Sequence, residues 1–255
     1  MRKETDRIIR KTPDEIKIMT EGGRKLGKIK KELAGVIKLG VNAQEVEILA
    51  EKLIKKTKGK PSFKMVPGYS WATCINVNDG VVHGVPHKRI VFKKGDIVSV
   101  DLGLFYKGFH TDTSFSVGIA PTQTQVKFLD IGKLALRCGI KKVIPGNRIF
   151  DVSEAIQDAL ETNNVFPIRA LVGHGIGRNL HEEPQVPCFT KGEKERSPKI
   201  NEGMVLAIEV MYTKGKPDIV VAEDGWTIST KDGKIAGLFE ETVAVTSNGP
   251  VVLTA

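Results

Sequence analysis

The chain has 255 residues, enough for one large domain or two small ones, and its 40% hydrophobic and 27% charged residues are ordinary for a soluble globular protein. No stretch approaches the roughly 18 apolar residues of a transmembrane helix, and no apolar run follows the basic amino terminus. We therefore expect no membrane partner and no secretory signal. Three widely spaced cysteines without a C-x-x-C pair argue against a disulfide framework and favour the cytoplasm.

The net charge of +9 is concentrated in two segments, RKLGKIKK (24–31) and EKLIKKTKGK (51–60). We interpret both as solvated helix faces, because they contain no aromatic residues for base stacking and match no nucleic-acid motif. No specific nucleic-acid partner is expected. Weak attraction to an RNA-rich body such as a ribosome stays open.

Two helices are predicted near the amino terminus, after a short basic segment of residues 1–11. TPDE (12–15) is a capping box with Pro13 at the first helical position, and apolar residues then recur at helical spacing: Met19, Leu26, Ile29, Leu33 and Val36. Asn42 offers a second cap, and an amphipathic pattern follows it at Val46, Leu49 and Leu53.

The rest of the chain alternates between strand and helix patterns. TCINVNDGVVHGV (73–85) is strand-like with a turn at Asn78-Asp79-Gly80, and helices are predicted from about Gln123 to Lys142 and from about Ile149 to Thr162. The strands GMVLAIEVMY (203–212) and GLFEETVAVT (237–246) flank a long connection through EDGWTISTKDGK (223–234). Helices followed by acid-bearing strands occur twice, which predicts one α+β domain of two related halves.

The stretch VSVDLGLFYKGFHTDTSFSVG (98–118) places Asp101 and Asp112 in the two strands of one hairpin, although aspartate is disfavoured in strands. A tight turn near residues 106–108 allows two registers. Asp101 faces Asp112 directly in one, whereas in the other it faces Ser114 and has Asp112 as its diagonal neighbour. Both registers put the carboxylates on one face, where a cation between them would relieve their repulsion. The alternative is that both face water on an edge hairpin.

Other polar residues lie in equally unusual positions. His174 is flanked by glycines in LVGHGIGRNLHEEP (171–184), VLAIEVM buries Glu209, and GLFEETVAV buries Glu240 or its neighbour Glu241. A charged residue in the core of a strand needs a partner or a metal. Two aspartates, one histidine and two glutamates from four segments suit a pair of hard-to-borderline divalent ions.

In chain order, VDLG, HTDTS, GHGIGRNLHEEPQVP, GMVLAIEVM, DGWTISTKDGK and FEETVAVT resemble type I methionine aminopeptidases, which are pita-bread metallopeptidases. The similarity extends from KTPDEIKIMTEGGRKLG (11–27) onward. It implies an α+β pita-bread (creatinase/aminopeptidase) fold, with pseudo-two-fold halves whose helices cover a curved antiparallel sheet. Residues 1–255 would form a single catalytic domain.

The resemblance also implies an activity. It is the metal-dependent removal of the N-terminal methionine from nascent proteins and peptides, with a preference for a small second residue. Two divalent ions (Co, Mn, Fe, Zn or Ni) would be bridged by a hydroxide that attacks the scissile carbonyl. The chain would act as a cytoplasmic monomer whose partners are nascent polypeptide N-termini.

Residue roles follow from the same resemblance. The metal ligands would be Asp101, Asp112, His174, Glu209 and Glu240, with Asp112 and Glu240 shared between the ions. The resemblance thus selects Glu240 over Glu241. Glu209 would also take and pass on the proton of the attacking water, His83 would contact the scissile amide, and His181 would stabilise the oxyanion. The methionine pocket would be lined by Tyr69, Cys74 and Trp226.

Some positions differ from the family pattern or have no role in it. Phe63, Val66 and Leu180 depart from familiar pocket residues, which leaves the details of the methionine pocket open. Four further residues are expected to be structural, His87 and His110 at the surface or in the core and Asp96 and Asp151 in turns or caps. Two other functions stay open: a proline-specific pita-bread peptidase with the same five ligands, and a non-catalytic pita-bread protein that binds the ribosome.

Overall fold

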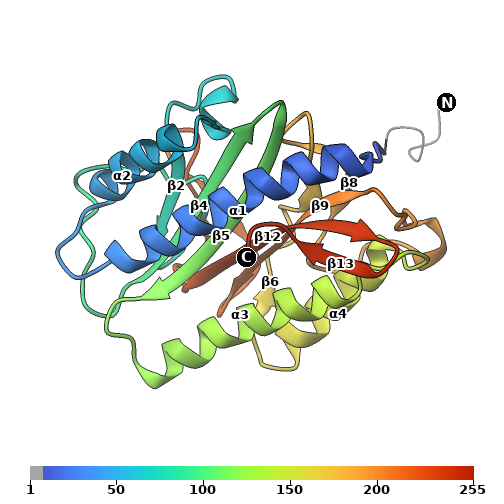
Figure 1. The fold of residues 1–255 in the computed structure, drawn as a ribbon. Helices are drawn as coiled ribbons and strands as arrows, with labels where there is room; N and C mark the ends of the chain where they lie inside the picture. Colours follow the sequence, from blue (N-terminus) through green and yellow to red (C-terminus); the bar gives the residue numbers. More distant parts are fainter. Residues whose placement is uncertain (1–7) are drawn as a thin grey trace.

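The computed structural model describes residues 8–255, which form helices packed on a large antiparallel sheet (Figure 1). Within this range the α-helices are α1 (Pro13–Val36), α2 (Ala43–Lys56), α3 (Gln123–Lys141) and α4 (Ile149–Glu161). Two short 3₁₀ helices, η2 (Phe63–Met65) and η3 (Lys194–Arg196), lie in connections. Each predicted helix is therefore confirmed, with α3 and α4 ending one residue earlier than expected. None of the helices between residues 8 and 255 is both long and apolar enough to cross a membrane.

Local capping explains where the helices begin. Glu15 donates its backbone N–H to the Thr12 hydroxyl at 3.3 Å, and its carboxylate accepts the Thr12 N–H at 2.8 Å. This is the predicted capping box, with Pro13 as the first helical residue. Asn42 and Glu45 repeat the arrangement at α2, and Asp151 accepts the N–H of Arg148 at the start of α4.

The main sheet has the strand order β1-β4-β5-β12-β9-β7-β8, and every pairing is antiparallel. Along this path the strands are β1 (Lys60–Pro61), β4 (Ile97–Tyr106), β5 (Phe109–Gly118), β12 (Ala236–Thr246), β9 (Val205–Thr213), β7 (Gly173–Gly175) and β8 (Glu182–Val186). Three more strands pair beside it: β2 (Thr73–Val77) with β4, β6 (Phe166–Pro167) with β9, and β13 (Gly249–Val252) with β12. The strands that carry Glu209 and Glu240, β9 and β12, thus lie near the middle of the sheet.

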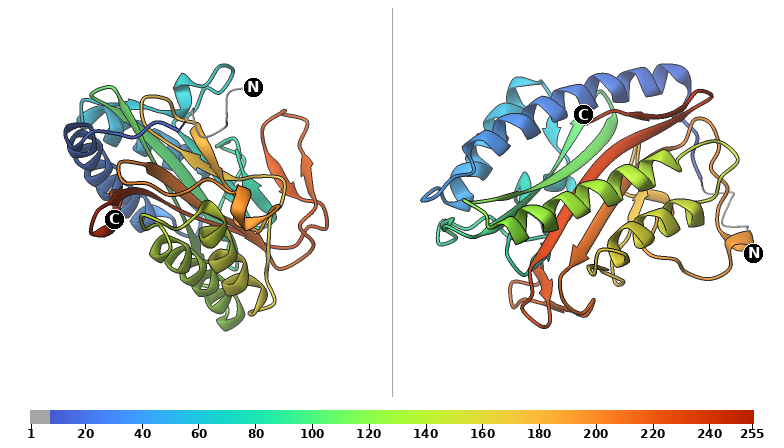
Figure 2. Two further views of the ribbon diagram at one scale, coloured as in Figure 1. Left: turned by 90° about the vertical axis from the view of Figure 1, so that its right-hand side faces the viewer. Right: turned by 90° about the horizontal axis from the view of Figure 1, so that it is seen from below.

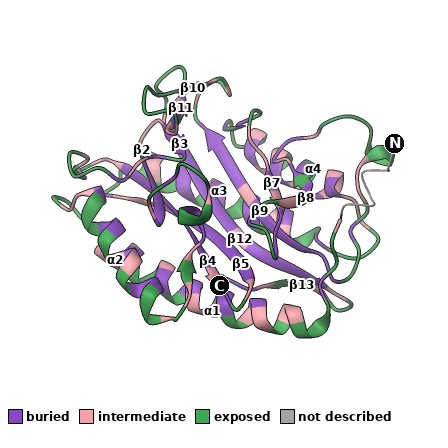
Figure 3. Cartoon of the chain, turned by 90° about the horizontal axis from the view of Figure 1, so that it is seen from above, coloured by how far each residue is buried: buried purple, intermediate pink, exposed green. Residues whose placement is uncertain are grey.

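Two helix pairs cover one face of this sheet. Leu26 and Leu33 of α1 share a core with Val100 and Leu102 of β4, whereas the core beneath α3 and α4 contains Phe128, Ile208 and Val210. A pair of helices packed on a pair of long strands therefore occurs twice, as the sequence predicted. The purple interior strands and green outer helix surfaces in Figure 3 show the same layering, and the class is α+β.

The connection after β9 differs from the prediction. It contains two strands, β10 (Ile219–Val221) and β11 (Ile228–Thr230), which form a three-stranded sheet with β3 (Gly80–Val82). The hairpin projects on the side of the main sheet away from the helices (Figure 2, left). These strands are only three residues long, and Val220 and Val221 are exposed. Such short, half-exposed strands leave little alternation in the sequence.

Candidate active site

The register of the β4–β5 hairpin determines how Asp101 and Asp112 lie relative to each other. Lys107 and Gly108 both have positive φ, 48° and 90°, as a two-residue hairpin turn requires. Tyr106 then pairs with Phe109, so Asp101 faces Ser114 and Asp112 is its diagonal neighbour. The second predicted register is the one observed.

The aspartates do not face water at a sheet edge, because β5 is paired with β12 on its other side. Asp101 is 7% exposed and Asp112 is 4% exposed. Their neighbours in β4, Val100 and Leu102, point into the core beneath α1 and α2. Since side chains alternate along a strand, both carboxylates point to the face opposite those helices.

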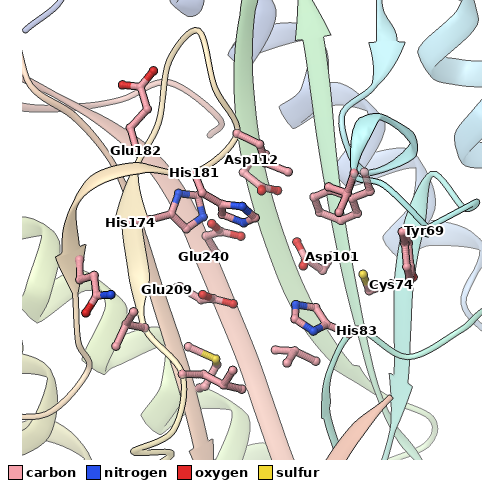
Figure 4. Close-up of a pocket in the computed structure, with 18 of the residues that line it drawn as sticks. Tyr69, Cys74, His83, Asp101, Asp112, His174, His181, Glu182, Glu209 and Glu240 are labelled. Carbon is pink, nitrogen blue, oxygen red and sulfur yellow. The ribbon is translucent and has the colours of Figure 1, made fainter. Parts of the chain in front are cut away.

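The same register argument brings the other acids and one histidine to that face. Ser114 pairs with Glu240, and Glu240 pairs with Glu209, so these side chains share a face with Asp101. His174 pairs with Ala207, two residues before Glu209 in β9. In Figure 4 the four carboxylates and the His174 ring converge on one space.

These residues fit a divalent cation. One ligand atom each of Asp112, His174 and Glu240 lies within 4.8 Å of the others. A carboxylate oxygen of Asp101, Oδ1, is buried without a hydrogen-bond partner in the described part of the chain. A buried anionic oxygen without a donor is costly unless a cation meets it. The oxygen-rich set with one imidazole matches hard-to-borderline divalent ions.

Burial also shifts the pKa values of the clustered carboxyl groups and of His174. It raises the pKa of Asp101 to about 7, and burial together with the neighbouring carboxylates raises the pKa values of Asp112 and Glu240. Burial lowers the pKa of His174 to about 4, so its ring is neutral near pH 7. His174 Nδ1 lies 2.8 Å from the carbonyl oxygen of Gly175, which can only accept. Nδ1 therefore carries the proton, and Nε2 is left free as a ligand atom.

Glu241 points the other way. Its carboxylate accepts from Lys30 Nζ of α1 at 2.6 Å, and the Thr254 hydroxyl also donates to it. Glu240 and Glu241, which the strand pattern alone did not separate, thus lie on opposite faces of β12.

Two further histidines flank the carboxylates. The His181 ring lies 4.5 Å from the His174 ring, centroid to centroid. His83 follows β3 with a left-handed φ of 58°, an unusual conformation for a residue with a side chain. Both residues are accessible from the cavity, and partial desolvation there lowers the pKa values of His83 and His181, which keeps the rings neutral near pH 7.

All the predicted site residues line one cavity of about 510 Å³ (Figure 4). Tyr69 and Trp226 form an aromatic wall, with ring centroids 5.0 Å apart. Cys74 pairs with Asp101 across β2 and β4, so its thiol faces the cavity. The three residues that depart from the family pattern, Phe63, Val66 and Leu180, line it as well. The cavity therefore combines a polar floor with an apolar end.

Comparisons with known proteins match this arrangement. The family model described as "Metallopeptidase family M24" matches residues 17–247. The chain is 38% identical to methionine aminopeptidase 1 of Bacillus subtilis, covering 97% of this chain and 99% of the relative. It is 40% identical to the methionine aminopeptidase of Clostridium perfringens, covering 97% and 98%. The chain belongs to metallopeptidase family M24, among the methionine aminopeptidases.

Solved structures of this family give the same fold. The methionine aminopeptidase of Thermotoga maritima superposes with a TM-score of 0.93 at 41% identity, covering 97% of this chain and 99% of that one. A prolidase from Pyrococcus furiosus is 22% identical with a TM-score of 0.75, and 65% of its length is covered, so it shows the fold alone. The expected pita-bread fold is confirmed. Members of M24 are metallopeptidases, in keeping with the ligand set on the sheet, and the non-catalytic alternative is not supported.

Several residues of this M24 site were not predicted. The cavity is also lined by Val82, Leu171, Val172, Glu182, Glu183, Gln185 and Met211. Glu182 is notable because an acidic pair after a turn, as in HEEP, usually indicates a solvated surface. His87 and His110 lie outside the cavity lining: His87 is exposed, and His110 is buried with its Nδ1 2.9 Å from the Ser62 hydroxyl.

Proposed function

We propose that this chain removes the N-terminal methionine from nascent proteins and peptides and prefers a small second residue. One observation carries the proposal. A row of four carboxylates and one imidazole on the sheet shares one cavity of about 510 Å³ with apolar and aromatic side chains. This combination supports metal-assisted hydrolysis at a peptide end, which agrees with the names of the relatives.

The metal site is proposed to hold two divalent ions, drawn from Co, Mn, Fe, Zn and Ni. The proposed ligands are Asp101, Asp112, His174, Glu209 and Glu240, with Asp112 and Glu240 shared between the ions. Bound divalent ions would lower the pKa of a water so that it is a hydroxide nucleophile at neutral pH, and they would polarise the carbonyl as Lewis acids. The support is the number of buried carboxylates, which exceeds what one ion needs for charge balance.

The protein's own groups are proposed to manage protons and orientation. Burial raises the pKa of Glu209 far above its usual range, which suits a carboxylate that takes a proton and returns it to the leaving amine. His181, just before β8, and His83, just after β3, reach the cavity on different sides of the carboxylates (Figure 4). As neutral imidazoles each can donate one N–H, His181 to the oxyanion and His83 to the scissile amide.

Specificity is assigned to the apolar end of the cavity. Tyr69, Cys74 and Trp226 offer aromatic and sulfur contacts, which suit an unbranched thioether side chain. The leaving residue has to pass beside His83, where a bulky second side chain would be excluded. Small second residues are therefore proposed to be preferred.

We further propose that residues 1–255 act as one catalytic domain, because ligands come from both halves of the sheet. Residues 1–7 of the predicted basic segment lie outside the described residues. A monomer in the cytoplasm is proposed, supported by three cysteines without disulfides. Weak ribosome association is proposed from the basic α1 and α2 surfaces and the net charge of +9.

The test is hydrolysis of Met-Ala-Ser, with Pro-Ala-Ser as the control peptide. The protein is first stripped with a chelator, and Co²⁺, Mn²⁺, Fe²⁺, Zn²⁺ and Ni²⁺ are then added back one at a time. Release of methionine only after metal is restored, with no release of proline, is expected. Faster cleavage of Pro-Ala-Ser would overturn the methionine assignment, and full activity of the stripped protein would overturn the metal assignment.

A further inference from the structure

Lys11 and Glu182 form a buried ion pair beside the active site. Lys11 Nζ lies 2.6 Å from Glu182 Oε2, and each side chain is only 2% exposed. Lysine and glutamate are rarely buried to this extent, and removing one partner leaves an uncompensated charge. The other ion pairs in the described residues have at least one side chain more than a tenth exposed. This pair therefore requires a structural or functional explanation.

Lys11 itself is held firmly at the amino-terminal side. Its backbone N–H donates to the Gly203 carbonyl at 2.6 Å, and its Nζ also donates to the Ile9 carbonyl at 3.2 Å. Lys11 directly precedes the Thr12 cap of α1. The ammonium group is thus fixed between the start of α1 and the turn before β9.

Glu182 is fixed from the opposite side. It is the first residue of β8, pairs with Gly175 of β7, and directly follows His181. Its second oxygen, Oε1, accepts the N–H of Asn179 at 3.1 Å. A Cβ at Gly177 would lie 2.3 Å from Lys11 Cε and 2.8 Å from Glu182 Oε1, so the turn from 177 to 182 closes tightly around the pair.

The His181 ring depends on that turn. No side chain or backbone group between residues 8 and 255 is hydrogen-bonded to this ring. In Figure 4 the His181 ring lies beside His174 and the carboxylates, whereas the Glu182 carboxylate points away from that ring. The ring's edge contact with the His174 ring and the backbone beneath it set its position, so a shift of the turn would also shift the ring. An imidazole displaced by about 1 Å can lose roughly 10²-fold in rate.

We propose that Lys11 is a positioning residue for His181, acting through its buried ion pair with Glu182. The pair fixes the turn that carries the His181 ring over the carboxylate row. This inference rests on the proposed role of His181 at the oxyanion. It gives a positioning role to Lys11, which belongs to the predicted basic amino-terminal segment of residues 1–11.

The test is a mutant cycle on Met-Ala-Ser with the metal-loaded protein. Lys11→Met should lower kcat by about 10²-fold while KM and bound metal stay within about twofold of wild type. His181→Ala alone should lower kcat by about 10²–10³-fold. In the His181→Ala background, Lys11→Met should cause no further loss in kcat, because its effect passes through the missing ring.

Two more variants separate positioning from damage to the fold. Glu182→Gln keeps the shape of the side chain and should give the same pattern with a smaller loss. Lys11→Met/Glu182→Gln removes both charges and should recover part of the kcat that Lys11→Met loses. Lys133→Met, which breaks an exposed ion pair with Asp130 on α3, is the matched control and should keep the wild-type kcat. If Lys11→Met does not fold, the same mutant cycle with His181→Ala is carried out with Glu182→Gln in its place.

The outcomes distinguish this inference from the proposed function. Wild-type kcat in Lys11→Met, or an equal fold-loss with and without the His181 ring, overturns the positioning role. Loss of bound metal in Lys11→Met also overturns it, since the effect would then act on the ligands. Full activity of His181→Ala instead overturns the assignment of His181 in the proposed function, and the inference fails with it.

Discussion

At the scale of one residue, His83 keeps a backbone conformation that is unfavourable for a residue with a side chain. Its φ of 58° lies in the left-handed region, where a side chain costs roughly 1–2 kcal/mol. The following residue, Gly84, packs closely against β2: its carbonyl accepts the Ile75 N–H at 2.8 Å, and a Cβ there would lie 2.2 Å from the Ile75 carbonyl oxygen. Strained residues of this kind gather at functional sites, where the surrounding structure holds them.

The strain at His83 can be measured. His83→Gly should be more stable than His83→Ala by about 1 kcal/mol, because glycine adopts positive φ without a steric cost. Both variants should lose most activity on Met-Ala-Ser. Urea denaturation midpoints of the two variants provide the measurement. Equal midpoints would mean that the left-handed backbone at this position carries no strain.

The carboxylates proposed as metal ligands allow a second prediction at this scale. Asp101→Asn and Glu240→Gln should each lower metal affinity and remove most activity at limiting metal, because each replaces an anionic oxygen donor. Glu241→Gln is the matched control, since Glu241 points to Lys30 on the other face. Bound metal after dialysis and the rate on Met-Ala-Ser are the readouts. Normal metal content in both ligand variants would contradict the proposed site.

At the scale of elements, α2 supports β2, a strand that lines the cavity. The buried carboxylate of Glu47 accepts the backbone N–H groups of Ala72 at 2.7 Å and Thr73 at 2.9 Å, and the Thr73 hydroxyl at 2.6 Å. The Tyr69 hydroxyl in turn donates to the Thr73 carbonyl at 2.9 Å. One helix side chain therefore anchors both β2 and the aromatic wall.

Glu47→Gln should lower the free energy of unfolding by about 1–3 kcal/mol, because an amide turns one acceptor into a donor facing other donors. Glu51→Gln, one turn later on α2 and half-exposed, should change it by less than about 0.5 kcal/mol. Urea unfolding followed by circular dichroism measures both. Equal effects of the two substitutions would count against an anchoring role for Glu47.

The β10–β11 hairpin carries Trp226 to the pocket, and its removal should affect selectivity. Trp226→Ala should reduce the preference for methionine over norleucine and leucine, since an apolar slot discriminates by only about 1–3 kcal/mol per methylene. The ratios of kcat/KM on Met-Ala-Ser, Nle-Ala-Ser and Leu-Ala-Ser report this change. Unchanged ratios would place the selecting wall elsewhere.

These elements also show what sequence could predict. The start of α1 was predictable because its cap lies within four residues, from Thr12 to Glu15. The acids were predictable because carboxylates inside apolar strands are unusual. The pair of Lys11 with Glu182 was not, since 171 residues separate the partners and each is common at surfaces. The register of Asp101 and Asp112 was narrowed to two choices, and only the turn geometry decided between them.

At the scale of the whole molecule, metal and fold stability are linked through protons. The raised pKa values mean that the folded metal-free chain keeps protons on its site carboxyls where the unfolded chain has lost them. The cluster therefore destabilises the metal-free fold increasingly as pH rises from about 4 towards 7. A bound divalent ion replaces those protons and relieves the repulsion. His174 acts on stability in the opposite direction between about pH 4 and 6.5, because its folded pKa of about 4 lies below the ordinary value. Its ring is already neutral above this range, so it releases no proton there when an ion binds.

The increase in Tm caused by saturating Mn²⁺ should consequently be larger at about pH 7.5 than at about pH 5.5. Differential scanning calorimetry with and without the ion, in buffers that do not bind metal, measures it. In Asp101→Asn the difference between the two pH values should shrink. An increase that is independent of pH would show that the site carboxyls hold no extra protons in the metal-free fold.

The position of β12 in the sheet determines how much of the fold a partly synthesised chain can form. This strand comes almost last along the chain, yet it lies between β5 and β9 in the sheet. A ribosome-bound chain that ends before residue 236 would lack Glu240 and would leave the edges of β5 and β9 without the strand that pairs with both. Open edges of long strands recruit other chains, so such intermediates are the species in which self-association competes with folding. Once β12 inserts, it closes both edges and adds Glu240 to the row of carboxylates in the same step.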